Sequence, residues 1–302
     1  MPFSGMENWR KGLVAQMKLR DGFYGACMAM TALLLSARGA FAEDIGIAKP
    51  WEIGFQKASS PVMDQIEWFH NVVLLSVAVG IVILVLGLML YCFIRFNARS
   101  NPNPSRTTHN TLIEILWTVI PAIILIVIAV PSLKLLYFAD RTPNPDLTVK
   151  AIGNQWFWTY EYPDQGDFSF DSVLVKEENL QPGQHRLLAT DTHVVVPVGE
   201  KVRLLTTSND VIHSWAIPAF GVKMDAVPGR TNETWFEAEE IGTYYGQCSE
   251  LCGKDHAFMP IVVDVVSKED FQKWVEEAKE KYAEGNTASP VQVALNGAPS
   301  GR

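Results

Sequence analysis

Two cysteines, a glutamate, a histidine and a methionine lie within thirteen residues in the stretch CSELCGKDHAFMP. The order Cys248-x3-Cys252-x3-His256-x2-Met259 allows the four side chains to converge from one tight loop at the end of a strand. Thiolate, imidazole and thioether together form the ligand set that copper takes in electron-transfer sites. The stretch therefore predicts a copper site.

A disulfide and a zinc site are the two alternatives for this stretch. A disulfide between Cys248 and Cys252 is plausible chemistry in an exported protein, but it leaves His256 and Met259 without a role. Zinc takes cysteine and histidine, but thioether is not among its usual ligands. The methionine therefore favours copper over both.

Two cysteines are one more than a blue copper site needs, and a thiolate has enough lone pairs to bridge two ions. A dinuclear core would then need a second imidazole. Of the six histidines, His213 is the best candidate because it begins the apolar segment HSWAIPAF just after a predicted strand. The alternative for His213 is a structural histidine with its hydrogen bonds satisfied.

Short segments rich in β-branched residues must position these side chains. LTVKAIG, HVVVPV, KVRLLTTS, TNETWFEA and PIVVDVV are separated by Gly, Pro, Asn and Asp. They predict an antiparallel sandwich or barrel over residues 140–266. A helix capped by Ser267 is expected over 267–284, and a disordered tail over 285–302. The apolar side chains of this helix fall on one face: Phe271, Trp274, Val275, Ala278 and Tyr282.

Two apolar runs precede this domain. Residues 72–94 and 115–133 contain no charged side chain over 23 and 19 positions. They predict a transmembrane hairpin over 71–139, with spans at about 72–94 and 112–137. The loop 95–111 between them carries Arg95, Arg99 and Arg106 and no acid, which places it in the cytoplasm.

The N-terminal 42 residues have the pattern of a cleaved signal peptide. A basic segment with Arg10, Lys11, Lys18 and Arg20 precedes the apolar run YGACMAMTALLL, and Ala-Phe-Ala ends at residue 42. The alternative is a third membrane helix, but the run is short for one. A signal peptide puts residues 43–70 and the C-terminal domain in the periplasm, anchored in a bacterial inner membrane.

The net charge argues against nucleic acid as a partner. The whole chain has a formal charge of −8. The first 42 residues hold five of the 25 basic and two of the 33 acidic residues, so 20 basic and 31 acidic residues remain, a charge near −11. Such a surface repels phosphates and favours a cationic partner.

In combination, these motifs closely resemble subunit II of the haem–copper cytochrome c oxidases of bacteria. The resemblance covers both spans, NQWFWTYEYP (154–163), HSWAIPAFGVKMDAVPGR (213–230) and the CSELCGKDHAFMP loop. It implies a membrane α plus all-β fold, in which a two-helix transmembrane hairpin precedes a cupredoxin-like Greek-key β-sandwich or barrel. It also implies that residues 140–266 hold the dinuclear copper centre called CuA.

The resemblance also assigns the copper ligands. It implies that Cys248 and Cys252 bridge both coppers. His213 and Met259 would complete one ion. His256 and the backbone carbonyl of Glu250 would complete the other, and the Glu250 carboxylate would reach a magnesium or manganese ion shared with subunit I.

The implied activity is electron transfer within an enzyme complex. Such a chain accepts electrons from cytochrome c at CuA and passes them to haem in subunit I, which reduces oxygen to water with proton pumping. Subunit I, and subunit III with it, would be the membrane partners. The oxygen chemistry would not occur in this chain, and no CxxCH motif is present to attach a haem.

Further roles follow from the resemblance. Trp156 would be the indole through which electrons enter, although the run WFW also fits a strand on which Trp156 and Trp158 share one face for packing. Glu114 would mark the entrance of a proton channel, although Thr111-Leu-Ile-Glu114 also fits a helix capping box. The docking acids for cytochrome c would be Glu161, Asp164 and Asp210.

Two other functions compete with this interpretation. Quinol oxidase subunit II has the same hairpin and sandwich but lacks the copper ligands, whereas every ligand position is filled here. A membrane-anchored copper chaperone or sensor needs exposed, exchangeable ligands, whereas this loop lies among aromatic residues. Both are therefore less favoured than the oxidase subunit.

Overall fold

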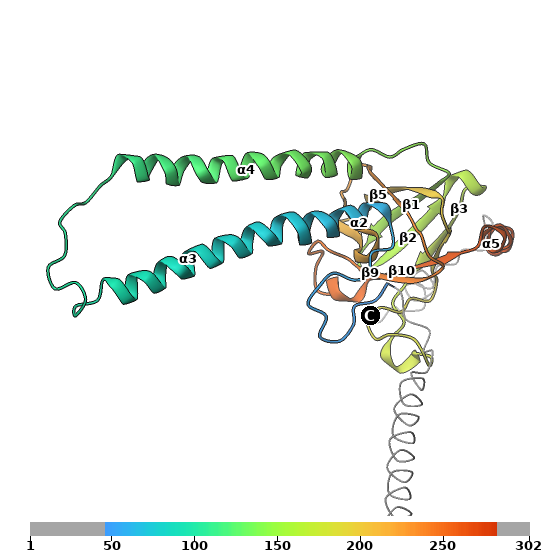
Figure 1. Cartoon of the computed structure of the whole chain (residues 1–302). Coiled ribbons are helices and arrows are strands. Elements are labelled where there is room, and N and C mark those ends of the chain that lie inside the picture. The colour runs from blue at the N-terminus through green and yellow to red at the C-terminus, as the bar shows by residue number, and fades with distance from the viewer. Residues whose placement is uncertain (1–45, 283–302) are drawn as a thin grey trace, which may run out of the picture. The chain divides into compact units, whose positions relative to one another are not determined.

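The computed structural model describes residues 46–282, which form two long helical segments followed by a β-domain and a last helix (Figure 1). The predicted signal peptide at 1–42 and the predicted tail at 285–302 lie outside the described residues. The strands are β1 (Leu147–Asn154), β2 (Phe157–Tyr162), β3 (Phe168–Ser172), β4 (Val194–Pro197), β5 (Lys201–Ser208), β6 (His213–Ile217), β7 (Val222–Ala226), β8 (Asn232–Glu237), β9 (Gly242–Gln247) and β10 (Pro260–Val266).

The first helical segment is longer than its apolar run. It comprises α2 (Pro61–Trp68), a π-helical turn η1 (Phe69–Leu74) and α3 (Leu75–Arg95). It therefore begins eleven residues before the expected start of the span at 72. Val62 and Met63 in the extra turns are buried. Tertiary packing therefore stabilises these turns, and a hydropathy pattern does not predict such packing.

The second helix, α4 (Thr111–Asp140), extends three residues beyond the expected end of its span, and both helical segments are long and apolar enough to cross a membrane. The expected capping box at Thr111 is wrong. Asn110 is the N-cap, and its side chain accepts a hydrogen bond from the backbone N–H of Ile113. Asn is at least as good an N-cap as Thr, and Glu114 remains in the first turn.

The β-domain has three sheets, with strand orders β3-β2-β1-β5-β8, β4-β10-β9 and β6-β7. Two pairings differ from the expected antiparallel arrangement, because β1 pairs with β5 and β4 pairs with β10 in parallel. Long connections separate the partners in both cases, and such crossovers permit parallel pairing. The sandwich itself is as expected.

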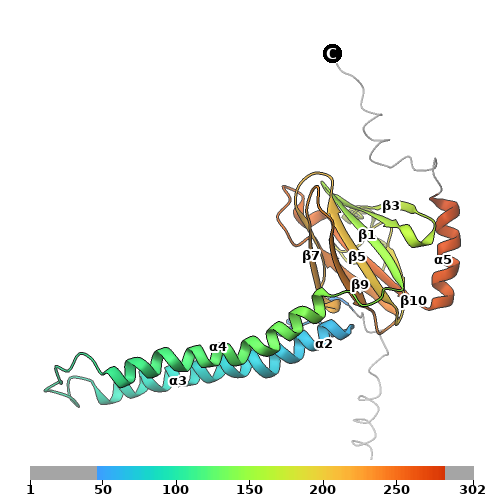
Figure 2. The same ribbon diagram turned by 90° about the horizontal axis from the view of Figure 1, so that it is seen from above.

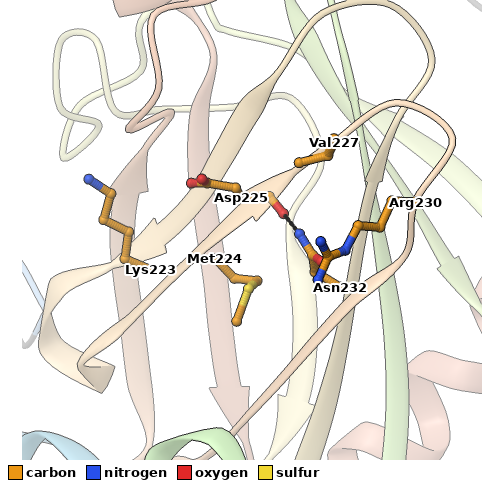
Figure 3. A pocket seen from close by; sticks show the side chains of 6 residues that line it. All are labelled: Lys223, Met224, Asp225, Val227, Arg230 and Asn232. Carbon is orange, nitrogen blue, oxygen red and sulfur yellow. Dashed lines mark hydrogen bonds between the residues drawn. The ribbon is translucent and has the colours of Figure 1, made fainter. Parts of the chain in front are cut away.

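A shallow pocket of about 400 Å³ lies on β7 and its connection to β8 (Figure 3). The Asn232 side chain donates to the backbone carbonyl of Asp225 at 2.7 Å. The lining contains none of the predicted metal ligands. It consists of Lys223, Met224, Asp225, Val227, Arg230 and Asn232.

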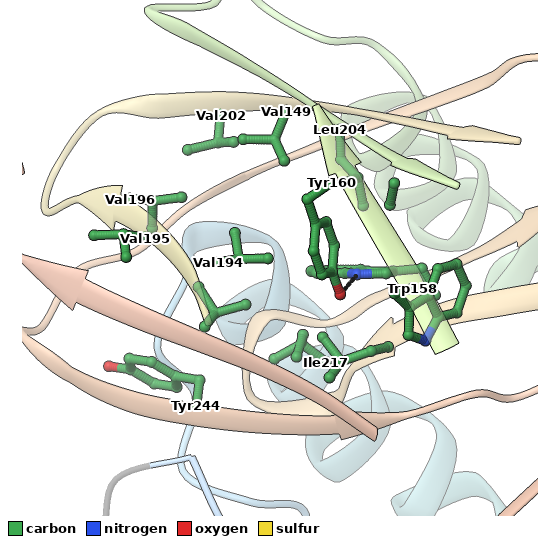
Figure 4. Packing of buried hydrophobic residues seen from close by; sticks show 14 of the residues in the cluster. Val149, Trp158, Tyr160, Val194, Val195, Val196, Val202, Leu204, Ile217 and Tyr244 are labelled. Atoms are coloured by element: carbon green, nitrogen blue, oxygen red, sulfur yellow. Dashed lines mark hydrogen bonds between the residues drawn. The ribbon is translucent and has the colours of Figure 1, made fainter. Parts of the chain in front are cut away.

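The core lies between the five-stranded sheet and the two smaller sheets. Alternate residues of β2 and β5 are buried, as a strand with one wet face requires. Side chains of β1 and β5, including Val149 and Leu204, lie across the core from Tyr244 of β9 (Figure 4). The buried Trp215 indole donates to the hydroxyl of Tyr160 at 3.2 Å, so this polar pair costs little on burial.

The last helix, α5 (Lys268–Lys281), covers one end of the β-domain (Figure 2). The Ser267 side chain accepts from the backbone N–H of Asp270 at 3.1 Å, as the expected cap requires. Phe271, Val275 and Ala278 are buried, and Trp274 packs on Tyr162 with ring centroids 5.1 Å apart. The apolar face expected from the sequence is therefore the face that packs.

The N-terminus of α2 is fixed to the turn that follows β6. That turn, η4, covers Pro218–Phe220. The Ser60 hydroxyl donates to the Phe220 carbonyl at 2.7 Å, and the Ser59 N–H donates to the Ala219 carbonyl at 3.0 Å. Gly221 (φ +67°) lies so close to Met63 that a Cβ would be 3.1 Å from its backbone. The first helical segment is therefore joined to the turn that follows the strand beginning with His213.

A polar group ties three strands of the domain together. His193, just before β4, lies 2.7 Å from Asp264 of β10, and Thr243 of β9 donates to the same carboxylate at 2.7 Å. Burial opposes protonation of His193, but the Asp264 carboxylate outweighs it and raises the pKa of His193. Burial also opposes ionisation of Asp264, but His193 outweighs it and lowers the pKa of Asp264.

These shifts predict where the pair stabilises the fold. The raised His193 pKa gives stability that is complete below 6.5 and disappears as the pH rises through the folded pKa. The lowered Asp264 pKa gives stability that is present above 3.8 and disappears as the pH falls. We expect Asp264→Asn to lower Tm by about 3 °C near pH 5, or ~1 kcal/mol, and by less near pH 9.

Calorimetry of the detergent-solubilised protein checks this expectation. Asp167→Asn is a suitable control, because Asp167 is exposed and its left-handed backbone (φ 57°) suits Asn. A loss of Tm for Asp264→Asn that does not change with pH would contradict the assigned role of the pair.

Candidate metal centre

The loop of residues 248–259 leaves the sandwich between β9 and β10. These strands form an antiparallel pair whose last register pair is Gln247 with Pro260. All the predicted metal ligands except His213 therefore lie in one loop whose two ends are held together by this pairing. A short helical turn, η5 (His256–Phe258), brings the chain back to β10.

Side chains of this loop converge with His213 of β6. The sulfur of Cys248 lies 3.8 Å from that of Cys252 and 3.9 Å from His213 Nδ1. The sulfur of Cys252 lies 3.5 Å from both His256 Nδ1 and Met259 Sδ. The structure thus brings together the five side chains that the sequence pointed to.

The backbone of Glu250 belongs to the same cluster. Its carbonyl oxygen lies 3.4 Å from the Cys248 sulfur, while its side chain is on the exposed side of the loop. His213, Cys248, Cys252 and Met259 are buried, and His256 is half-buried. The donors therefore line a mostly dry site with one edge near solvent.

The distances fit metal ligands better than a disulfide. Both cysteines are free, and their sulfur separation of 3.8 Å far exceeds the ~2.05 Å of a disulfide. Two sulfurs held about 2.3 Å from one ion at a tetrahedral angle would lie about 3.8 Å apart. The ligand atoms of His213, Cys248 and Cys252 all lie within 4.8 Å of one another, so these three can hold a metal ion.

The two thiols have different electrostatic surroundings. Burial raises the pKa of Cys248, but hydrogen bonds with His213 and with the backbone of Ser214 outweigh burial and bring that pKa to about 6. Burial and the adjacent Cys248 raise the pKa of Cys252 to about 12. Because a metal binds the thiolate, loading this site must displace a proton from Cys252.

His213 is held on several sides. Its Nε2 lies 2.8 Å from Asp210 Oδ1, which leaves Nδ1 toward Cys248. Burial opposes its protonation, but Cys248 and Asp210 outweigh burial and raise the pKa of His213. Trp158 contacts the ring edge-on with centroids 5.9 Å apart, and a Cβ on Gly153 would lie 2.6 Å from the ring. A side chain at residue 153 would therefore displace the imidazole.

Trp156 lies beside the same loop, but not on a strand as one expectation had it. It occupies the turn between β1 and β2, whose last register pair is Asn154 with Phe157. Its indole N–H donates to the Cys252 carbonyl at 3.2 Å, and the side chain is half-buried. Lys254 lies over the ring, with Nζ 5.5 Å from the centroid.

The acids expected to dock a partner are scattered. Only Asp210 adjoins the turn that carries Trp156. Glu161 is paired with Lys150 on the neighbouring strand at 2.8 Å. Asp164 lies in the turn η2 (Pro163–Gln165), at the opposite end of β2 from Trp156 and roughly 20 Å along the strand.

Sequence reasoning missed two residues at this site. The Gln155 side chain donates to the Cys252 carbonyl at 2.8 Å, next to the bond from Trp156. Gly153 provides the space for His213. The Gly153-Asn154-Gln155 run immediately before the tryptophan was the available signal, but only the fold shows that it meets the loop.

Comparisons with known proteins agree with this architecture. Residues 147–266 match the family described as cytochrome C oxidase subunit II, periplasmic domain, and residues 48–135 match its transmembrane domain. The probable cytochrome c oxidase subunit 2 of Rickettsia bellii is 52% identical, over 82% of this chain and 87% of that protein. The Rickettsia felis protein of the same name is 47% identical, over 95% of this chain and 86% of that protein.

A solved structure also matches. The periplasmic domain of subunit II of cytochrome oxidase (CoxB) of Bradyrhizobium japonicum is 57% identical, covering 47% of this chain and 100% of that chain, with a TM-score of 0.45. The family is assigned from the two family matches and from the sequence identity of 52% and 47% to relatives over most of both chains. The chain belongs to the cytochrome c oxidase subunit II family, as a membrane-anchored subunit of that oxidase with a cupredoxin-like C-terminal domain.

Proposed function

We propose that this chain holds a dinuclear CuA centre and carries electrons from cytochrome c toward haem in subunit I. The observation that carries the proposal is the convergence of Cys248, Cys252 and His213 with the other donors of the loop. The donor set contains soft sulfur and imidazole, which suits copper, and two thiolates could bridge two ions. When bound, the copper pair supplies a one-electron relay.

The residues of this chain would keep that centre rigid and dry. His213 and Met259 would hold one ion, and His256 and the Glu250 carbonyl the other, with Cys248 and Cys252 between them. The side chains of His213 and Met259 are 0% and 1% exposed, so water is excluded on their side. A ligand frame that is already formed needs little rearrangement when charge changes.

Trp156 would be the point of electron uptake. It is half-buried at the surface, and its indole N–H touches the carbonyl of a cysteine ligand. Cytochrome c would dock over it through surface acids, for which Glu161, Asp164 and Asp210 remain the candidates. Their separation in the structure makes a single compact acidic patch around Trp156 the less favoured arrangement.

The remaining roles concern the complex and its orientation. The exposed Glu250 side chain is free to reach a magnesium or manganese ion shared with subunit I, with subunit III as a further partner. Glu114 would mark a proton-channel entrance. A periplasmic C-terminal domain, a cytoplasmic loop at 95–111 and a cleaved signal peptide at 1–42 complete this proposal.

The alternative functions fit the site less well. A chaperone or sensor would need exchangeable ligands, whereas four of the five donor side chains are buried. A copper-free quinol oxidase subunit would not need the donors to converge. Zinc accounts for Cys and His but gives Met259, 3.5 Å from the Cys252 sulfur, no role as a ligand.

Copper binding tests the proposal directly. Purified protein loaded with copper should hold two ions per chain. It should show hyperfine splitting from two equivalent copper nuclei, because bridging thiolates would let the two ions share one unpaired electron. Cys248→Ser should abolish that signal. Cys92→Ser should retain it, because Cys92 lies on α3. One copper per chain, or splitting from a single nucleus, contradicts the proposal.

Electron uptake tests Trp156. Trp156→Phe should slow reduction by cytochrome c about tenfold, equivalent to ~1.4 kcal/mol of barrier, while the copper spectrum stays unchanged. Stopped-flow reduction measures the rate. Trp274→Phe, on α5, serves as the control because this half-buried indole packs on Tyr162 away from the loop. Unchanged kinetics in Trp156→Phe would remove its proposed role.

A further inference from the structure

The carboxylate of Asp210 joins two parts of the metal centre that are distant in sequence. Its Oδ1 accepts from His213 Nε2 at 2.8 Å. Its Oδ2 accepts from the backbone N–H of Gln155 at 2.6 Å, in the turn between β1 and β2. Oδ1 also accepts from the Val211 N–H at 2.6 Å. Both oxygens are therefore engaged by internal donors, and the side chain is only 31% exposed.

The turn in question returns to the ligand loop. The Gln155 amide and the Trp156 indole donate to the same Cys252 carbonyl, at 2.8 and 3.2 Å. A continuous path of hydrogen bonds thus runs from His213 to Asp210, from Asp210 to the Gln155 backbone N–H, and from the Gln155 side chain to the Cys252 carbonyl. The path links a histidine donor on β6, a cysteine donor on the loop and the surface tryptophan.

We propose that Asp210 is a positioning residue that fixes His213 and the Trp156 turn relative to each other. This inference rests on the proposed copper function. The hydrogen bond to Nε2 makes that nitrogen the donor, so Nδ1 is the nitrogen presented toward Cys248, 3.9 Å away. The bond from the Gln155 backbone holds the turn where Trp156 reaches Cys252.

The other two docking candidates have no such connection. Glu161 forms a surface pair with Lys150, and Asp164 lies at the far end of β2. Substituting either one removes a surface charge and leaves the path from His213 to Cys252 intact. Asp210 therefore differs from them in what it touches, and the difference can be measured.

Two substitutions separate position from charge. Asp210→Asn keeps the shape but removes the charge, whereas Asp210→Glu keeps the charge but moves the carboxylate by one methylene. We expect both to weaken copper affinity of the full chain about 10- to 100-fold and to shift the spectrum and the reduction potential. Asp164→Asn should leave the copper affinity, spectrum and potential unchanged. Circular dichroism and Tm show whether each variant folds.

A docking role without a positioning role predicts a different result for Asp210. If Asp210→Asn and Asp210→Glu keep the wild-type copper affinity, spectrum and potential, and only the salt-dependent association of Asp210→Asn with cytochrome c weakens, Asp210 is a docking acid alone. If the wild-type chain itself fails to bind two coppers, the proposed function fails, and this inference fails with it. The wild-type measurement thus distinguishes the two failures.

A second variant keeps the test decisive if Asp210→Asn does not fold. Gln155→Met removes the 2.8 Å bond to Cys252 but keeps the Asp210 carboxylate and the backbone bond to it. We expect it to shift the copper spectrum and to slow electron uptake through Trp156. A wild-type spectrum and wild-type kinetics in Gln155→Met would overturn the proposed path.

Discussion

The pairing of Gln247 with Pro260 is the constraint on which the rest of the structure depends. It closes the β9–β10 ladder, so the twelve residues between form a loop with fixed ends. Five donors of the proposed centre come from that loop. The sixth, His213, is brought to them because β6 lies against β9. Just beyond β9, the Ser249 N–H of the loop donates to the Ser214 carbonyl of β6 at 2.9 Å. Gly246 packs directly on the Ala216 carbonyl, and no side chain fits there.

The same strand links the centre to the membrane helices. His213 begins β6, and the turn η4 after β6 holds Ser60 at the start of α2. At the other helix, the indole of Trp235 on β8 donates to the Phe138 carbonyl of α4 at 3.2 Å. The helices therefore contact the β-domain through hydrogen bonds and packing.

Local sequence patterns predicted much of the fold and of the site. They failed where contacts between residues distant in sequence determine the structure. The donors of the loop and the uncharged runs were readable because each depends on residues close in sequence. Tertiary packing sets three features that could not be predicted from local sequence. They are the start of the first helix at Pro61, the turn position of Trp156 and the parallel pairing of β1 with β5. Asp210 was readable only as a surface acid, since its bond to Gln155 spans 55 residues.

The central claim is that two copper ions lie between Cys248 and Cys252, each with one histidine. Diffraction from crystals of the copper-loaded protein, with data collected at the copper absorption edge, tests it most directly. The account predicts two anomalous peaks between the two sulfurs, one beside His213 and Met259 and the other beside His256 and the Glu250 carbonyl. A single peak, or a pair of cysteines joined as a disulfide with no copper beside them, would contradict it.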